Sequence, residues 1–308
     1  MSVKFRIDFK TAQRLPTKLF SEDGFALPGR SSDTVLLIHG LTGAPNEMKR
    51  LGFLLNQHGY AVRCPRLAHH GEPIGILKDT KWQECYQSVR AAFFQLEKEK
   101  PNGQIFVSGL SMGALLALLL AEEFPDRIAG VSCLSPTLFY DGWNTPWSRH
   151  LLPLAYATPL KHFFYFKEES PYGIKNEAIR ERIHRYYEKA GLDDIDQVAQ
   201  YGYPYFPVSL LTELHFLVRH LSKRLGRIKT PVQLIQAKED DMTSVKNSQF
   251  IYDRIQSDIK EMVLLYDSYH IITADQERDL VAEKVGFFFD RLRNGTKFIQ
   301  PGASAEVA

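Results

Sequence analysis

This sequence is poor in cysteine and has no long hydrophobic run, and each shortage excludes a class of protein. Among 308 residues there are only three cysteines, Cys64, Cys85 and Cys133, and they make neither a CxxC pair nor a spacing typical of metal ligands. We therefore expect reduced thiols in an intracellular protein. The longest apolar run, residues 114–121, is far shorter than the ~20 residues that cross a membrane, and charges near the N-terminus replace the apolar core of a signal peptide. We predict a soluble, cytoplasmic protein.

An excess of one charge is also missing. The 38 basic and 36 acidic residues nearly cancel, to a net charge of +2. Proteins that bind nucleic acid through its phosphates usually have a basic excess, so nucleic acid is not an expected partner. With 44% hydrophobic and 24% charged residues, the composition is that of an ordered globular protein and excludes a disordered or fibrous chain.

Short β-rich runs alternate with helical patterns along much of the chain. Such alternation predicts an α/β fold, with a mostly parallel sheet covered by helices on both faces. The predicted strands lie at 35–38, 60–63, 104–108, 128–134, 231–236 and 261–266, and the clearest helices at 47–57, 81–98 and 112–124. The core domain is therefore expected at residues 1–136 and 227–293, with an edge hairpin in its first 33 residues.

Residues 137–226 break this alternation, because they contain no clear buried strand. Their first part is rich in aromatic residues and their second part has helical patterns. We interpret the segment as an insertion between two strands of the sheet, placed as a lid or cap. Residues 294–308 are expected to form a flexible tail.

The motif Gly109-Leu110-Ser111-Met112-Gly113 is the first candidate for chemistry. It follows a predicted strand directly and opens a predicted helix, which is the setting of a nucleophile elbow. Such a turn holds its serine in a strained backbone conformation, and the glycines remove side chains that would clash. We predict Ser111 as a catalytic nucleophile.

A serine nucleophile needs a base, and the base needs a carboxylate that orients it. His270 follows the last predicted strand, so it can meet Ser111 at the carboxyl edge of a parallel sheet. Glu239, Asp240 and Asp241 follow the preceding strand. Asp240 is our first choice for the acid and Asp241 the second.

The turn His39-Gly40-Leu41-Thr42-Gly43 follows the first core strand and is expected to expose backbone amides above the sheet. Backbone amides can stabilise the oxyanion of a tetrahedral intermediate. We assign the oxyanion hole to the amides of Leu41 and Met112. The side chain of His39 is expected to be structural.

With these motifs, the chain resembles the α/β-hydrolase superfamily, and within it the bacterial carboxylesterase and monoacylglycerol lipase group. The resemblance spans about 34–136 and 227–293, and its matching segments are HGLTG (39–43), GLSMG (109–113), QAKEDDM (236–242) and SYHIITADQE (268–277). It implies the α/β-hydrolase fold with a helical lid insertion. Because the group has an acidic residue and then Met after its acid, the resemblance favours Asp240 over Asp241. Trp82 matches a tryptophan that opens a helix in the group, with packing as its expected role.

The chain departs from the group in two places. His69-His70-Gly71 stands where relatives often have Gly-His-Gly, and we interpret it as a loop at the rim of the pocket, since no third metal ligand has suitable spacing. The insertion 137–226 is longer than the usual lid, so substrate preference does not transfer. Its aromatic residues predict either an apolar acyl pocket or a core of its own.

One helix near the end of the insertion is amphipathic and basic. Its polar face predicts weak contact with an anionic membrane surface, contact with a phosphate-bearing substrate, or only the solvated face of a helix packed on the sheet. The apolar stripe comprises Leu214, Leu217, Val218, Leu221, Leu225 and Ile228, and the basic residues are Arg219, Lys223, Arg224 and Arg227.

The sequence therefore predicts a serine carboxylic-ester hydrolase that acts on an apolar acyl ester, either a small molecule or a lipid. Ser111, His270 and Asp240 form the triad, and no metal or organic cofactor is expected. A thioesterase or an acyltransferase with the same triad is the alternative, because the leaving group does not change the triad. A ligand-binding protein that has lost turnover is a more remote one.

Overall fold

The computed structural model describes residues 20–21, 24–100, 102–147, 152–156, 158–189 and 202–295. Of the edge hairpin predicted in residues 1–33, residues 20–21 and 24–27 are described and pair antiparallel at the edge of the sheet. Most of the predicted tail at 294–308 lies outside the described ranges.

An eight-stranded sheet forms the centre of the molecule, with strand order β1-β2-β4-β3-β5-β6-β9-β10. The six strands from β4 to β10 are mutually parallel, and only β1 and β2 run antiparallel to their neighbours. The bounds are β1 Phe20–Ser21, β2 Gly24–Leu27, β3 Thr34–Ile38, β4 Ala61–Pro65, β5 Ile105–Leu110, β6 Gly130–Leu134, β9 Val232–Ala237 and β10 Lys260–Leu265. The α/β fold and all six predicted strands are confirmed, with ends that differ by one or two residues.

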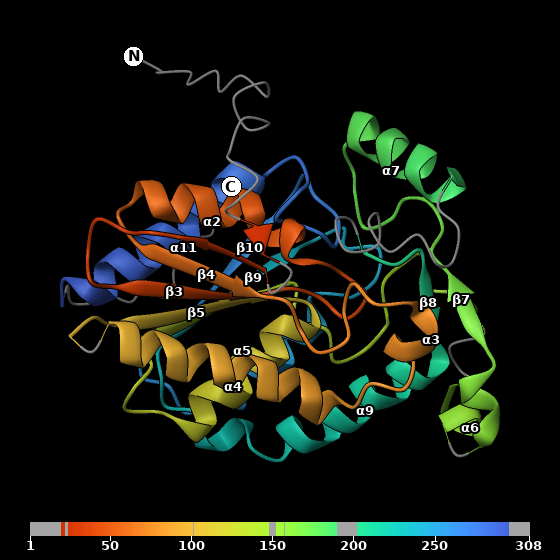
Figure 1. Ribbon diagram of the computed structural model, residues 1–308, viewed down its shortest axis with the longest axis horizontal. Helices are drawn as coiled ribbons and strands as arrows, with labels where there is room; N and C mark the ends of the chain where they lie inside the picture. The colour runs from red at the N-terminus through yellow and green to blue at the C-terminus, as the bar shows by residue number, and fades with distance from the viewer. Residues whose placement is uncertain are drawn as a thin grey trace, which may run out of the picture.

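Helices cover both faces of the sheet (Figure 1). On one face lie α2 (Lys49–Gln57) and α11 (Arg278–Arg293), and on the other α4 (Trp82–Glu99), α5 (Met112–Glu123) and α9 (Val208–Ser222). Because successive side chains of a strand point to opposite faces, β3 supplies both layers. Leu36 and Ile38 join the core beneath α4 and α5, while Val35 and Leu37 join the core beneath α2 and α11.

The central strands β3, β5, β6 and β9 are buried at every residue, since they have neighbours on both sides and helices above and below. Helix α5 is buried all round over residues 112–121. Shorter helices are α3 (Ile74–Leu77) and α10 (Lys246–Tyr252), and single 3-10 turns form η2 (Pro45–Met48), η4 (Pro159–His162) and η5 (Leu225–Arg227).

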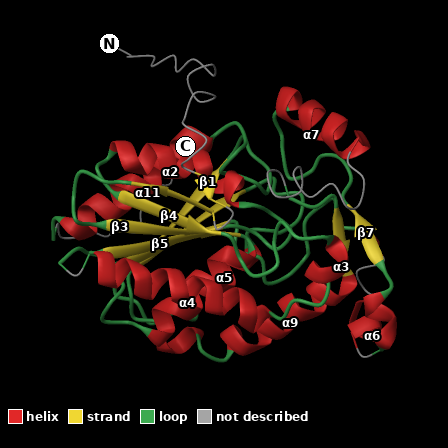
Figure 2. Cartoon of the chain, in the orientation of Figure 1, coloured by secondary structure: helices red, strands yellow, loops and turns green. Residues whose placement is uncertain are grey.

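The segment between β6 and β9, for which we predicted an insertion, has two parts. Its last long helix, α9, packs against α4 and α5. All residues of the predicted apolar stripe are buried, but the predicted helix is shorter than expected, because α9 ends at Ser222 and Leu225 and Ile228 lie beyond it. The remainder contains α6 (Leu152–Tyr156), α7 (Glu177–Lys189) and a small antiparallel sheet of β7 (Tyr165–Lys167) and β8 (Tyr205–Pro207). These four elements lie at one end of the molecule, where α6 and β8 contact α9 (Figure 2).

None of the described helices combines the length and the apolar character that a membrane crossing requires.

Candidate active site

Ser111 occupies a sharp turn between β5 and α5. Its backbone has φ 57° and ψ −116°, a conformation that L-residues rarely adopt. The flanking glycines are required by close approach: a Cβ at Gly109 would lie 2.2 Å from the backbone of Gly113, and one at Gly113 would lie 2.3 Å from the carbonyl of Ile38. The motif thus forms the strained elbow expected from its sequence.

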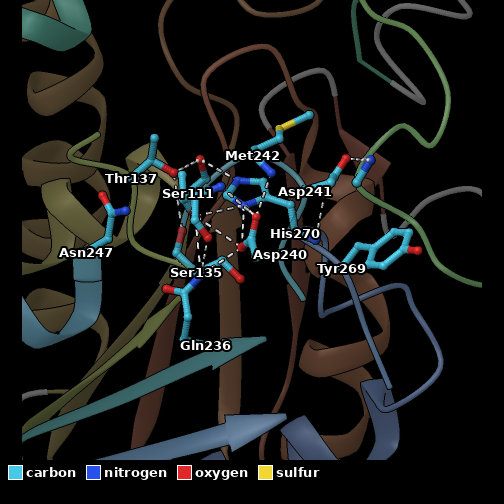
Figure 3. Close-up of polar contacts among 12 residues, drawn as sticks. Ser111, Ser135, Thr137, Gln236, Asp240, Asp241, Met242, Asn247, Tyr269 and His270 are labelled. Atoms are coloured by element: carbon cyan, nitrogen blue, oxygen red, sulfur yellow. Dashed lines mark hydrogen bonds and ion pairs between the residues drawn. The ribbon is translucent and has the colours of Figure 1, made fainter. Parts of the chain in front are cut away.

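Three loops at the carboxyl ends of the strands bring the predicted triad together (Figure 3). His270 Nε2 lies 3.1 Å from Ser111 Oγ, and His270 Nδ1 lies 2.9 Å from Asp240 Oδ2 and 3.1 Å from Asp240 Oδ1. Ser111 follows β5, Asp240 follows β9 and His270 follows β10, which are far apart in sequence but end at one edge of the sheet. This arrangement can pass a proton from the serine to the imidazole.

The carboxylate of Asp240 is almost fully buried, and four further donors hold it. Oδ1 accepts the amides of Met242 at 2.9 Å and Thr243 at 2.8 Å. Oδ2 accepts the side chains of Gln236 at 2.7 Å and Thr243 at 3.1 Å. A buried charge is tolerable only with such partners, and here they also fix its direction toward His270.

Asp241, the second choice for the acid, faces elsewhere. It accepts the backbone amides of His270 at 3.3 Å and Gly173 at 3.1 Å, so it holds the histidine loop to the segment before α7. Burial raises the pKa of Asp241 to about 6. Adjacent aspartates therefore make different contacts, and only Asp240 reaches the imidazole ring.

Opposing effects set the pKa of His270. Burial alone lowers it, but the charge and the hydrogen bond of Asp240, together with the charges of Asp241 and Glu47, raise it above its usual value. The surroundings of His270 thus favour the protonated form of its ring.

The 39–43 turn is held by two buried histidines. His39 Nε2 accepts the amide of Leu67 at 3.2 Å, so its Nδ1–H donates to the carbonyl of Gly40 at 3.0 Å. The carbonyl of Gly40 and the amide of Leu41 share one planar peptide, so this bond also fixes the direction of the Leu41 amide. His70 Nε2 contacts the carbonyl of Leu41 at 2.7 Å and holds the next peptide. Among the described residues, the amides of Leu41 and Met112 have no protein acceptor.

Other residues named from the sequence lie around this turn or further away. His69 pairs with the exposed carboxylates of Glu72 and Glu84, and Trp82 is packed beside His220. In the described part of the chain, no three His, Cys, Asp or Glu side chains form a group that could hold a metal ion.

Two threonines next to the triad could not be identified from the sequence. Thr137 Oγ1 lies 2.8 Å from Ser111 Oγ, on the side opposite His270, and Thr243 Oγ1 lies 3.4 Å from His270 Nδ1. Threonine is common in loops, so only the folded arrangement singles these two out.

A cavity of about 160 Å³ opens onto Ser111 and His270. A larger one of about 360 Å³ lies beside it, and both are lined by Tyr140, Glu168, Phe206 and Met242. The aromatic segment supplies only part of these walls. Tyr140 lines both cavities and Tyr165 and Phe166 line the larger one, whereas the exposed large side chains there are Phe139, Trp143, Trp147, Phe163, Phe164 and, partly, Tyr165.

Comparison with known proteins places the chain among hydrolases. Residues 29–277 match the family model described as serine aminopeptidase, S33. A carboxylesterase of Bacillus subtilis is 27% identical over 263 residues, 84% of this chain and 92% of the relative. A thermostable monoacylglycerol lipase of a Bacillus species is 29% identical over 256 residues, 83% of this chain and 89% of the relative.

Solved structures agree with this placement. A structure from the study of the metagenome-derived lipolytic enzymes LipS and LipT is 27% identical, with a TM-score of 0.70 over 86% of this chain and 97% of the other. The monoglyceride lipase of Saccharomyces cerevisiae, at 16% identity, shares the fold with a TM-score of 0.72 over 87% of this chain and 91% of the other. The chain belongs to the serine aminopeptidase S33 family of α/β hydrolases, in the group of the bacterial carboxylesterases and monoacylglycerol lipases.

Proposed function

We propose that this α/β hydrolase cleaves carboxylic esters through an acyl-enzyme on Ser111. The observation that supports it most directly is the position of the His270 ring, with Nε2 3.1 Å from the serine oxygen and Nδ1 2.9 Å from Asp240. The relatives named for carboxylesterase and monoacylglycerol lipase activity support the same class of substrate.

In this mechanism His270 takes the proton of Ser111 while the serine oxygen attacks the ester carbonyl. The amides of Leu41 and Met112 stabilise the resulting oxyanion, and each such donor contributes on the order of 3 kcal/mol. Asp240 keeps the imidazole oriented and stabilises its protonated form. His270 then gives the proton to the leaving alcohol, and a water activated by the same histidine releases the acid.

We place the acyl chain in the larger cavity. Its apolar lining includes Leu152, Phe166, Phe206, Leu211 and Met242, which suits an alkyl chain. The smaller cavity beside the nucleophile is left for the alcohol. Residues 137–226 act as the lid in this scheme, because both cavities draw walls from them.

We also propose weak contact with a membrane surface through this lid. The basic segment around α9 does not support it, because its apolar stripe is buried. Arg224 and Arg227, which follow the end of α9, pair with Glu122. The exposed side chains of Trp147, Leu154, Phe163 and Phe164 offer a better surface, with Lys161 and Lys167 among them. Replacing Phe163 and Phe164 by serine should reduce sedimentation with anionic vesicles, and unchanged sedimentation would remove this part of the proposal. A cytoplasmic location stays a prediction.

Hydrolysis of p-nitrophenyl esters from acetyl to palmitoyl, with Ser111→Ala as the blank, tests the main proposal. We expect a clear optimum of chain length that disappears in the blank. A fluorophosphonate probe should label Ser111 in the folded protein, and failure to label it would favour the non-catalytic binding protein.

Labelling by the probe without hydrolysis of any ester would instead favour the thioesterase or the acyltransferase. These use the same acyl-enzyme, so acyl-CoA thioesters and added alcohol acceptors are the substrates to try next.

A further inference from the structure

The cavity beside Ser111 has an acidic and aromatic lining. Two glutamates, Glu47 and Glu168, face it, whereas no lysine or arginine is among its described lining residues. His270 is the one basic side chain there. The tyrosines of the lining are Tyr140, Tyr172, Tyr186, Tyr187 and Tyr203.

Each glutamate accepts one hydrogen bond from another described residue. Glu47 Oε2 accepts the amide of Gly40 at 3.3 Å, and Glu168 Oε2 accepts the hydroxyl of Tyr187 at 2.9 Å. Within the described residues, neither carboxyl takes part in an ion pair with lysine or arginine. Asp240 shows the contrast, since five groups satisfy it. An ionised carboxylate in such surroundings is unfavourable until a cation joins it.

The ionisation of both glutamates responds to this environment. Burial raises the pKa of Glu47 to about 7 and that of Glu168 to about 8. Both groups therefore change charge between about pH 6 and pH 9. A cation in the cavity would favour their ionised forms, and the low polarity that penalises them alone would strengthen the attraction.

The tyrosine rings add a second kind of recognition. Tyr187 packs edge to face against Tyr172, with ring centroids 5.4 Å apart and planes at 89°, and lies 5.4 Å from Tyr186. Aromatic rings attract a cation electrostatically, and three of the five lining tyrosines are here in contact with one another. This is the usual environment of a bound ammonium group.

We propose that this cavity binds an ammonium group on the alcohol part of the substrate, held between Glu47, Glu168 and the tyrosines. The ester carbonyl of the same molecule then reaches Ser111, and its acyl chain enters the larger cavity. This inference rests on the proposed esterase function and narrows it to cationic esters. A neutral polyol could hydrogen-bond to the same carboxyls, but above about pH 8, where both carboxyls are ionised, it would leave their charges uncompensated.

A matched pair of substrates tests this directly. Choline butyrate and 3,3-dimethylbutyl butyrate have the same shape and differ in a quaternary nitrogen in place of a carbon. We expect kcat/KM to favour choline butyrate at least tenfold at pH 8.5, and this preference to shrink as the pH falls to 6. The charge of choline does not change with pH, and the titration of His270 affects the hydrolysis of both esters equally. The ratio of the two kcat/KM values therefore reports on the ionisation of the glutamates. Asp241 is the other carboxyl close by that titrates in this range.

Glu168→Gln should lower the ratio of the two kcat/KM values severalfold. Glu181→Gln, the same change on the exposed side of α7, is the matched control and should keep both the ratio and the activity. If Glu168→Gln does not fold, the pH dependence of the wild-type ratio decides alone.

The outcomes separate the two proposals. Hydrolysis of the neutral ester with no preference for choline butyrate at either pH would overturn the ammonium site and leave the esterase intact. No hydrolysis of either butyrate or of any p-nitrophenyl ester would overturn the esterase, and the ammonium site with it.

Discussion

The two sides of the catalytic cavity are built differently. On one side the loops after β5, β9 and β10 present a triad in which every polar atom has a partner. On the other side, Glu47 and Glu168 face the cavity with carboxyls that each accept a single hydrogen bond among those the described residues make. A fully satisfied group is fixed in one state, whereas a poorly satisfied one is left to interact with a ligand.

Carboxyl groups illustrate the difference. Asp240 accepts bonds from two backbone amides, two side chains and the ring of His270. Glu168 accepts one bond, from Tyr187, and its pKa is raised to about 8. The same chemical group is thus a structural charge on one side of the cavity and a titrating group on the other.

The largest effects on activity are expected for substitutions in the triad. Ser111→Ala and His270→Ala should each reduce kcat by a factor of about 10⁴ or more, because the triad acts as a unit. Circular dichroism should show an unchanged fold. If either variant kept a large share of the activity in the p-nitrophenyl assay, the assignment of the triad would be wrong.

Neighbouring aspartates offer the next test. Asp240→Asn should reduce kcat by roughly 10³ to 10⁴, since the amide cannot hold the imidazole in the required tautomer. Asp241→Asn should cost only about tenfold, because it disturbs the His270 backbone and not the ring. The two variants make the same change at adjacent positions, and the reverse ranking would make Asp241 the acid.

Asp275 joins the two sides and should matter for stability. It is fully buried and accepts the amides of Lys175 at 2.7 Å, Asn176 at 2.8 Å and Tyr269 at 2.8 Å. Asp275→Ala leaves these amides unpaired, and we expect a loss of about 3 kcal/mol in the free energy of unfolding, measured in urea. Asp279→Ala removes an exposed ion pair with Arg50 and should change it by less than about 1 kcal/mol. Equal losses would mean that Asp275 does not connect the two sides.

The side of the cavity that carries the triad is also the side that could be predicted from the sequence. The elbow glycines, the chain order of Ser111, Asp240 and His270, and the strand before each of them are local patterns. Packing then brings them together, because parallel strands end at one edge.

The other side of the cavity, around Glu47 and Glu168, has no such local sequence pattern. Glu47, Glu168 and the tyrosines come from separate segments, and nothing local distinguishes a cavity tyrosine from a surface one. The aromatic run predicted either an apolar pocket or a small core, but several of its members, such as Trp147 and Phe163, are exposed. Strands β7 and β8 were missed because they are only three residues long and partly exposed.

The smallest expected effect comes from the electrostatic interaction between Glu47 on one side of the cavity and His270 on the other. The charge of Glu47 helps to raise the pKa of His270, which must be neutral to accept the serine proton. As the pH falls, His270 becomes protonated and kcat/KM declines. Glu47→Gln removes that charge, so this acidic limb should move to lower pH by roughly half a unit, a small shift because Glu47, with its pKa raised to about 7, is itself only partly ionised there. Glu99→Gln, at the far end of α4, should leave the limb unchanged. A limb that stayed in place or moved to higher pH in Glu47→Gln would show that the two sides of the cavity titrate independently.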